Sequence, residues 1–273
     1  MLRFFLLGLI TLQAWAINPN QRLQQGTLSY YGADFKIKNN PALKSDTSRV
    51  LNMIHTYRPN KPDIIAVCEN SGECYRHKTM SYSDARIVLF DQLHTENDRA
   101  GKFVEDVYCM KKFYFTNVRD LAARHDQINV EHTWPQSRFN ARINKDMQKT
   151  DLHHLFPTES QANSIRGNHI FGEAPATNTN QPLCNTSQIH HGRNIVFTPP
   201  SQHRGNVARA LFYFSVKYDL PITSEEEKVL RQWHAEDPVD SEEEERHNKI
   251  ASIQLTRNPF IDYPEMVDEI TDF

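Results

Sequence analysis

The chain has 273 residues, of which 38% are hydrophobic and 24% charged, and a formal net charge of −3 at neutral pH. This length suits one large domain or two small ones, and neither an internal repeat nor a low-complexity tract divides it, which favours one domain. The acidic balance argues against a nucleic-acid partner, but basic side chains outnumber acidic ones between residues 117 and 210, so a positive cleft on an acidic body stays possible.

The first sixteen residues, MLRFFLLGLITLQAWA, have the features of a secretory signal peptide. They combine one positive charge, an apolar run from Phe4 to Leu12 and a small-residue site at the end. The run is too short to cross a bilayer comfortably, and the rest of the chain has no long apolar stretch. We therefore expect an exported protein, secreted or periplasmic, whose mature form begins near Ile17 and has no membrane segment.

Four cysteines lie in the mature chain, and an even number in an exported protein favours two disulfides. Cys68 and Cys74 flank turn-forming residues, so we expect them to close a small loop on each other. Cys109 and Cys184 then remain for a long-range bridge. Four cysteines allow three pairings, and four free buried thiols are the alternative.

Periodicity and capping signals predict an α+β domain with helices in the majority. Ser224 with Glu227 and Ser241 with Glu244 each fit a capping box, in which a hydroxyl and a carboxylate satisfy the first free N–H groups of a helix. In chain order, we predict helices over 46–57 and 83–94, strands over 101–109, 127–132 and 152–158, a short helix that includes Asn163, and helices over 204–218, 225–235 and 242–254.

The strand over 127–132 ends in a glutamate beside a histidine, Glu131 and His132. Adjacent side chains of a strand point to opposite faces, so this pair can serve one site only where the strand ends or twists. Pro135 supplies such an end, because it has no N–H to donate to a sheet. For an isolated pair, the simpler interpretation is a solvated glutamate and a chance histidine on an edge strand.

The next informative segment is TDLHHLFPTESQANSIRGNHIFG, residues 150–172. We expect a strand and then a capping box of Thr158 and Gln161 that starts a helix through Asn163, with Gly167 as its natural stop. The order strand, connection, strand and helix brings Glu131, His132 and Asn163 to one face. A carboxylate and an amide oxygen suit Mg²⁺, which keeps several waters and takes few protein ligands. We therefore assign one Mg²⁺ to Glu131 and Asn163, with Mn²⁺ or Ca²⁺ able to replace it in binding, and His132 stays unligated as a base.

Zinc is the alternative metal, because Asp151, His153, His154 and His132 resemble its ligands. Two observations count against it. Adjacent histidines of a strand point to opposite faces, and the chain has no His-x-x-x-His pattern. A zinc phosphoesterase that acts on small molecules is therefore a secondary hypothesis.

Four blocks of the chain resemble, in order, the motifs of the bacterial endonuclease I family: EHTWPQSRF, DLHHLFPTESQANSIRGN, PPSQHRGNVARALFYFS and DPVDSEEEERHNKIASIQLTRNPFIDYPE. The similarity runs from about residue 105 to 265 and is looser over 17–100. Members of this family are exported nonspecific nucleases with a ββα-metal, or His-Me finger, active site. The resemblance implies one nuclease domain over 17–273, after the signal peptide at 1–16, with the ββα-metal core at about 127–168.

For the reaction, the resemblance implies a division of labour among three residues. His132 corresponds to the general base that activates water, and Glu131 and Asn163 to the two protein ligands of a single Mg²⁺. Hydrolysis in this way leaves 5′-phosphate and 3′-hydroxyl ends. An imidazole with an ordinary pKa near ~6.5 would make the rate rise with pH through that value.

We assign phosphate binding to arginines. Recognition through phosphates predicts that DNA, RNA or both are bound independently of sequence and in a salt-sensitive way. We expect the protein to be a monomer. In the family, the arginine that holds the phosphate lies between the two strands. This chain is shorter there, so the candidates are Arg138 and Arg142. Arg166 is a further candidate, because it matches the family's RGN motif. Arg204 and Arg209 are candidates for binding the flanking phosphates. A nucleic-acid-binding matrix protein on a decayed nuclease scaffold is the remaining alternative, although Glu131, His132 and Asn163 together argue for an active enzyme.

Overall fold

The computed structural model describes residues 27–68, 73–173, 184 and 186–273. The expected signal peptide, residues 1–16, lies outside the described residues. Within them, no helix has the length and apolar character needed to cross a membrane.

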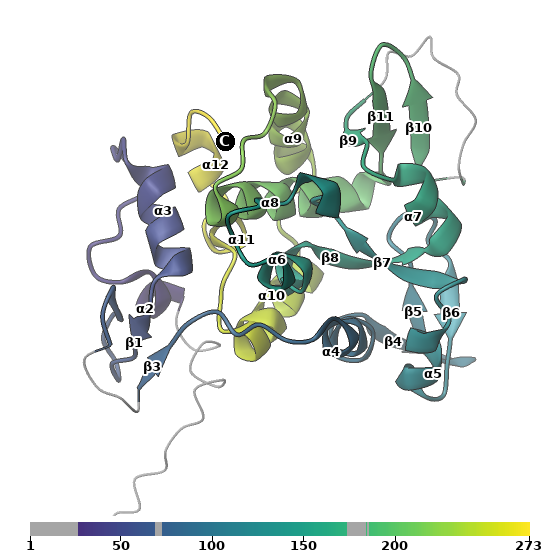
Figure 1. Cartoon of the computed structure of the whole chain (residues 1–273), viewed down its shortest axis with the longest axis horizontal. Coiled ribbons are helices and arrows are strands. Elements are labelled where there is room, and N and C mark those ends of the chain that lie inside the picture. Colours follow the sequence, from purple (N-terminus) through teal and green to yellow (C-terminus); the bar gives the residue numbers. More distant parts are fainter. Residues whose placement is uncertain (1–26, 69–72, 174–183, 185) are drawn as a thin grey trace, which may run out of the picture.

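The structure is an α+β body in which helices outweigh strands (Figure 1). Its N-terminal part consists of short elements around a small antiparallel sheet of order β2-β1-β3. These elements are α2 (Thr27–Tyr31), α3 (Leu43–Asn52), β1 (His55–Thr56), β2 (Ile64–Ile65) and β3 (Cys74–Tyr75). Next along the chain come α4 (Tyr82–Val88), the π-helix η1 (Leu89–Leu93), an antiparallel sheet of β4 (Thr95–Asp98), β5 (Gly101–Glu105) and β6 (Lys112–Tyr114), and α5 (Val118–Ala123).

The C-terminal part is built on one buried helix, α8 (Ser201–Tyr218). From Val207 to Tyr218 every side chain of α8 is buried, because neighbouring helices cover it on several sides (Figure 1). The principal neighbours are α3 and α9 (Ser224–Glu236), and α10 (Ser241–Gln254), α11 (Pro259–Asp262) and α12 (Met266–Glu269) complete this part. The large apolar core therefore holds α8 in place, and the catalytic candidates lie at its edge.

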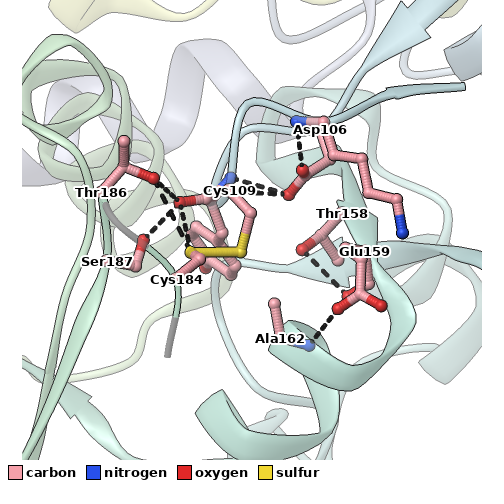
Figure 2. Close-up of a disulfide and its surroundings, with 10 residues drawn as sticks. Asp106, Cys109, Thr158, Glu159, Ala162, Cys184, Thr186 and Ser187 are labelled. Carbon is pink, nitrogen blue, oxygen red and sulfur yellow. Dashed lines mark hydrogen bonds between the residues drawn. A yellow bond between two sulfur atoms is a disulfide. The ribbon is translucent and has the colours of Figure 1, made fainter. Parts of the chain in front are cut away.

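Between these parts lies a two-stranded antiparallel sheet followed by a helix. β7 (Ile128–His132) pairs with β8 (Leu155–Glu159), so that Glu131 lies opposite Phe156. The connection contains the 3₁₀ turn η2 (Gln136–Arg138), α6 (Lys145–Lys149) and the 3₁₀ turn η3 (Leu152–His154). Helix α7 (Ser160–Arg166) follows β8 directly and packs against both strands. Its N-terminus is capped by the Glu159 carboxylate, which accepts from the Ala162 N–H at 2.8 Å (Figure 2), and it ends at Gly167, whose φ is 55°.

After α7 the chain forms a third small sheet, of order β10-β11-β9. Its strands are β9 (Ile170–Phe171), β10 (Gln188–His191) and β11 (Ile195–Thr198). This sheet is tied to the rest of the molecule by a disulfide between Cys109 and Cys184, whose Cα atoms are 5.6 Å apart (Figure 2). The second disulfide joins Cys68 to Cys74. The structure therefore forms both disulfides that the sequence predicted.

Several sequence-based boundaries need correction. The predicted helix over 46–57 is α3, which ends at Asn52, and residues 55 and 56 form β1 instead. The predicted strand over 101–109 ends at Glu105, as β5. Helix α7 is capped by Glu159 and not by Thr158.

Helices α9 and α10 are capped by Thr223 and Asp240, each one residue before the predicted serine. The predicted strand over 152–158 begins as the turn η3, which Asp151 caps by accepting from the His153 N–H at 3.1 Å. As a result, His153 and His154 are neighbours in a turn and do not point to opposite faces of a strand.

Candidate active site

A pocket of about 310 Å³ opens where β7, α4 and α7 meet. Glu131 and His132 both line it, although they are consecutive residues. This is possible because the strand ends at His132 and the chain turns at Pro135, which also lines the pocket. The other lining residues are Tyr82, Asn129, Val130, Gln136, Ser137, Asn163, Arg166, Gly167 and Asn168.

His132 is held in one tautomer by its hydrogen bonds. Its Nε2 lies 3.0 Å from the Lys149 carbonyl oxygen, which can only accept, so Nε2 carries the proton. In the neutral ring Nδ1 is then the basic nitrogen, and the amide nitrogen of Gln136 lies 3.4 Å from it. The arrangement leaves Nδ1 as the atom that can take a proton from a ligand or water in the pocket.

The pKa of His132 is lowered to about 3, chiefly because burial disfavours the imidazolium. The nearby His154 ring and the charges of Lys149 and Arg166 lower it further, while the hydrogen bond to the Lys149 carbonyl acts in the opposite direction. His132 is therefore neutral, and available as a base, throughout the range in which an ordinary histidine titrates. A rate limb near pH ~6.5, expected from an unperturbed imidazole, does not follow from this environment.

Glu131 is buried, with 1% of its surface exposed, and two donors meet its Oε1. The Tyr108 hydroxyl donates at 2.9 Å, and Nη1 of Arg166 lies 3.1 Å away. Burial raises the pKa of Glu131, whereas Arg166 and the Tyr108 hydrogen bond lower it. The two donors therefore offset part of the cost of an ionised carboxylate at this position.

Arg166 is as buried as Glu131 and is tied to the end of β7. Besides its ion pair, it donates to the carbonyl oxygens of His132 at 3.2 Å and Thr133 at 2.7 Å. The two terminal nitrogens of its guanidinium are thus occupied by protein acceptors that set the direction of the strand end. These contacts make Arg166 a positioning residue for Glu131 and His132. They leave few of its N–H groups available to bind a phosphate.

Asn163 reaches the pocket from α7. Its side-chain nitrogen donates to the Val130 carbonyl at 3.2 Å, which leaves the amide oxygen as the atom available to a ligand. A carboxylate and an amide oxygen that line one open, polar pocket fit the donor preferences of a partly hydrated Mg²⁺. The residues present therefore fit such an ion, with Glu131 shared between it and Arg166.

The other four arginine candidates lie away from the pocket wall. Arg138 bonds to Glu226 at 3.2 Å and stacks on Trp134. Two further arginines are held by acidic partners: Arg204 by Glu173 at 2.7 Å, and the buried Arg209 by Glu243, with distances of 2.9 and 2.5 Å. Arg142 is exposed and has no side-chain bond to the described residues, so it is the freest of the four.

The residues that suggested zinc have structural partners instead. Asp151 is fully buried and accepts from Lys217 at 2.9 Å, Tyr213 at 2.9 Å and Tyr218 at 2.7 Å. His153 Nε2 bonds to the Thr256 carbonyl at 3.0 Å. Across the described part of the chain, no group of three or more His, Cys, Asp or Glu side chains is arranged to hold a metal ion. The geometry gives the zinc hypothesis no support.

Sequence reasoning missed four residues of this site: Tyr108, Gln136, Tyr82 and Lys149. Tyr108 and Tyr82 lie more than twenty residues before the Glu-His pair and reach it only through the tertiary fold. Lys149 acts through its backbone carbonyl, which no side-chain pattern reveals. Gln136 was visible in the EHTWPQSRF block, four residues after the base, and could have been proposed from its position beside the turn at Pro135.

Comparison with known proteins gives a consistent picture. A family model described as Endonuclease I matches residues 69–265. The extracellular ribonuclease of Bacillus subtilis is 34% identical over 160 residues, which cover 52% of this chain and 53% of that protein. An extracellular deoxyribonuclease of Aeromonas hydrophila is 28% identical over 159 residues, or 53% of this chain and 70% of that protein. Endonuclease-1 of Buchnera aphidicola is 33% identical over 113 residues, or 41% and 44% of the two chains. The chain spans about half the length of the ribonucleases it matches.

Proposed function

Because the chain belongs to the endonuclease I family, we propose that it is an exported endonuclease that hydrolyses the phosphodiester bonds of DNA, RNA or both. One observation carries the proposal: a neutral His132, with a basic Nδ1, shares a pocket with the oxygen donors Glu131 and Asn163. These are the groups that metal-assisted phosphodiester hydrolysis requires. Relatives named both as ribonucleases and as deoxyribonucleases keep both substrates open.

In this reaction His132 takes a proton from the attacking water through Nδ1. The imidazolium that forms is stabilised by the Lys149 carbonyl, which already accepts from Nε2 and interacts more strongly with a charged donor. Arg166 and Tyr108 hold Glu131 ionised and oriented. A Mg²⁺ bound by Glu131 and Asn163 would stabilise charge on the phosphate and on the departing 3′ oxygen, giving 5′-phosphate and 3′-hydroxyl products.

The core of the enzyme is β7, β8 and α7, which we assign as the ββα-metal motif of one nuclease domain over 17–273. Export to the periplasm or the medium is supported by the two disulfides and by relatives named extracellular or periplasmic. Substrate binding through phosphates makes recognition largely independent of sequence. Of the arginine candidates, Arg142 has the free side chain that a phosphate contact needs, and we expect the enzyme to act as a monomer.

One assay tests the proposal directly. Supercoiled plasmid and a structured RNA are incubated side by side with the protein, in Mg²⁺ and in EDTA, with His132→Ala as the matched control. We expect nicking or degradation of at least one substrate in Mg²⁺ only, and its loss in the variant. Binding of both substrates without cleavage would favour a matrix protein on a decayed scaffold. Cleavage that survives EDTA would refute the metal dependence.

A further inference from the structure

The wall of the pocket beside His132 contains an aromatic ring, with a cation packed against it, and the proposed chemistry uses neither side chain. Tyr82, from α4, lines the pocket, and its ring is stacked on that of His132 with centroids 6.0 Å apart. Nζ of Lys149, from α6, lies 4.2 Å from the centre of the Tyr82 ring. A positive charge therefore lies against the ring that forms part of the pocket wall.

The position of Tyr82 is fixed by its own helix. One turn later on α4, the buried Arg86 donates to the Ile128 carbonyl at 2.6 Å and to the Asn129 side chain at 3.1 Å. Both acceptors belong to β7, the strand that carries the base. Helix α4 is thus anchored on β7, and the Tyr82 ring is a rigid part of the pocket wall.

Lys149, like the exposed Arg142, has no acidic partner among the described residues, whereas the other four arginine candidates each have one. Arg166, Arg138 and Arg204 are each paired with a carboxylate, whereas the Lys149 ammonium forms no ion pair with any carboxylate of the described residues. Its charge is also close enough to His132 to help lower the pKa of that imidazole. The ring contact holds the ammonium in place without neutralising it.

We propose that Lys149 and Tyr82 form a subsite for the nucleic-acid strand, in which Lys149 binds a phosphate next to the one that is cut and Tyr82 supports the adjoining sugar or base. This inference rests on the proposed nuclease function. A lysine is a flexible point charge that can turn from a ring to a nearby phosphate. An aromatic face can pack against any nucleotide, so the subsite adds affinity without sequence preference.

The test measures binding of a short fluorescent DNA duplex in EDTA, by anisotropy, at several salt concentrations. Lys149→Gln should weaken binding at low salt by roughly three- to tenfold and reduce the magnitude of the log–log salt slope by about 0.9, the value for one lost phosphate contact on a duplex. Lys149→Arg should restore most of both. Lys145→Gln is the matched control, since Lys145 is exposed on the same helix and should leave the slope unchanged.

Kinetics with plasmid in Mg²⁺ separate this subsite from a structural role. Lys149→Gln should raise KM and change kcat by less than about threefold, because the base keeps its carbonyl partner. Tyr82→Phe should bind normally, whereas Tyr82→Leu should weaken binding. Equal effects of Lys149→Gln and Lys145→Gln on the salt slope would overturn the subsite. If the wild-type protein cleaves neither DNA nor RNA, the proposed function itself fails, which is a different outcome from an active enzyme that does not need Lys149.

Discussion

Glu131 has the environment that most constrains the chemistry of the site. A carboxylate must be ionised to bind a cation, yet burial raises its pKa. Arg166, 3.1 Å away, and the Tyr108 hydroxyl act against that rise. The same guanidinium repels any cation that Glu131 binds. We therefore expect a metal site of modest affinity. Arg166 weakens the binding of the cation by repulsion, but it keeps the Glu131 carboxylate ionised and in a fixed orientation.

Removal of Arg166 should show how much the pair depends on it. Arg166→Met leaves Glu131 as a buried charge without an ionic partner, and loss of one partner of a buried pair costs about 3–5 kcal/mol. Urea unfolding at pH 7 measures this loss. The double variant Glu131→Gln with Arg166→Met removes both charges and should recover a large part of it. Additive losses in the double variant would show that the two side chains do not interact.

The pH dependence of the rate follows from the environment of His132. Because its pKa is lowered to about 3, the base is already unprotonated at pH 5 and above. Initial rates of plasmid cleavage at fixed, saturating Mg²⁺ should therefore show no acid limb with an apparent pKa near ~6.5. The control is His132→Ala, whose residual rate should have the same pH dependence over this range. A limb near pH 6.5 that the variant lacks would mean that His132 titrates like an exposed histidine.

At the scale of elements, the sequence predicts local structure well where the signal is local. The three long helices of the C-terminal part, the strand that ends in Glu131 and His132, and the helix with Asn163 lie within about a residue or a turn of their predicted positions. The predicted helix over 46–57 ends early, at Asn52, and the predicted strand over 152–158 begins as a turn. The helix caps are displaced by one residue because two capping patterns overlap: Thr223 with Glu226 and Ser224 with Glu227 both fit the motif. The sequence pattern alone cannot distinguish the two caps, because the first helical residue depends on the path of the preceding loop.

The candidate site shows the same limit more clearly. That Glu131, His132 and Asn163 line one pocket could be predicted, because they lie in short motifs within one strand-strand-helix segment. The sequence could not predict which arginines are free to bind a phosphate. Arg166 and Arg209 have acidic partners, Glu131 and Glu243, that lie more than thirty residues away in the chain. Whether a cation is free for substrate is therefore a property of the tertiary fold.

The two disulfides should differ in their contribution to stability. They close loops with sequence separations of 75 for Cys109–Cys184 and 6 for Cys68–Cys74. Loop-closure entropy gives about 4.5 kcal/mol for the first and about 2 kcal/mol for the second. Urea unfolding of the paired serine variants, Cys109→Ser with Cys184→Ser and Cys68→Ser with Cys74→Ser, compares them. Equal losses would mean that the long-range bridge does not restrict the unfolded chain as this account requires.

The whole molecule should lose stability in mild acid. Burial lowers the pKa of His132 and His203 to about 3 and that of His154 to about 4. In the unfolded chain these groups titrate near ~6.5. Below that pH these histidines bind protons in the unfolded state but stay neutral in the folded state. The stability that they contribute is therefore fully present above pH ~6.5 and is lost as the pH falls toward the folded pKa values.

The size of this effect is set by linkage. Each proton that is bound only in the unfolded state lowers the free energy of unfolding by up to about 1.4 kcal/mol per pH unit. Urea midpoints measured at pH 7, 6 and 5 should therefore decrease, and more steeply between 6 and 5. The variant His203→Gln, which replaces a histidine outside the catalytic pocket, should have a shallower decrease. A midpoint that is constant from pH 7 to 5 would contradict the burial of these neutral rings.

The most direct test of the central claim is a Mg²⁺ titration of plasmid cleavage by the wild type and three variants. The claim is that His132 is the base and that Glu131 and Asn163 bind the metal. His132→Ala should lose about 10²- to 10⁴-fold in rate and keep the wild-type dependence on Mg²⁺, because no ligand is lost. Glu131→Gln and Asn163→Ala should require more Mg²⁺ and recover part of their activity when it is in excess. The account is contradicted if His132→Ala is the variant that excess Mg²⁺ rescues, since the histidine would then be a ligand.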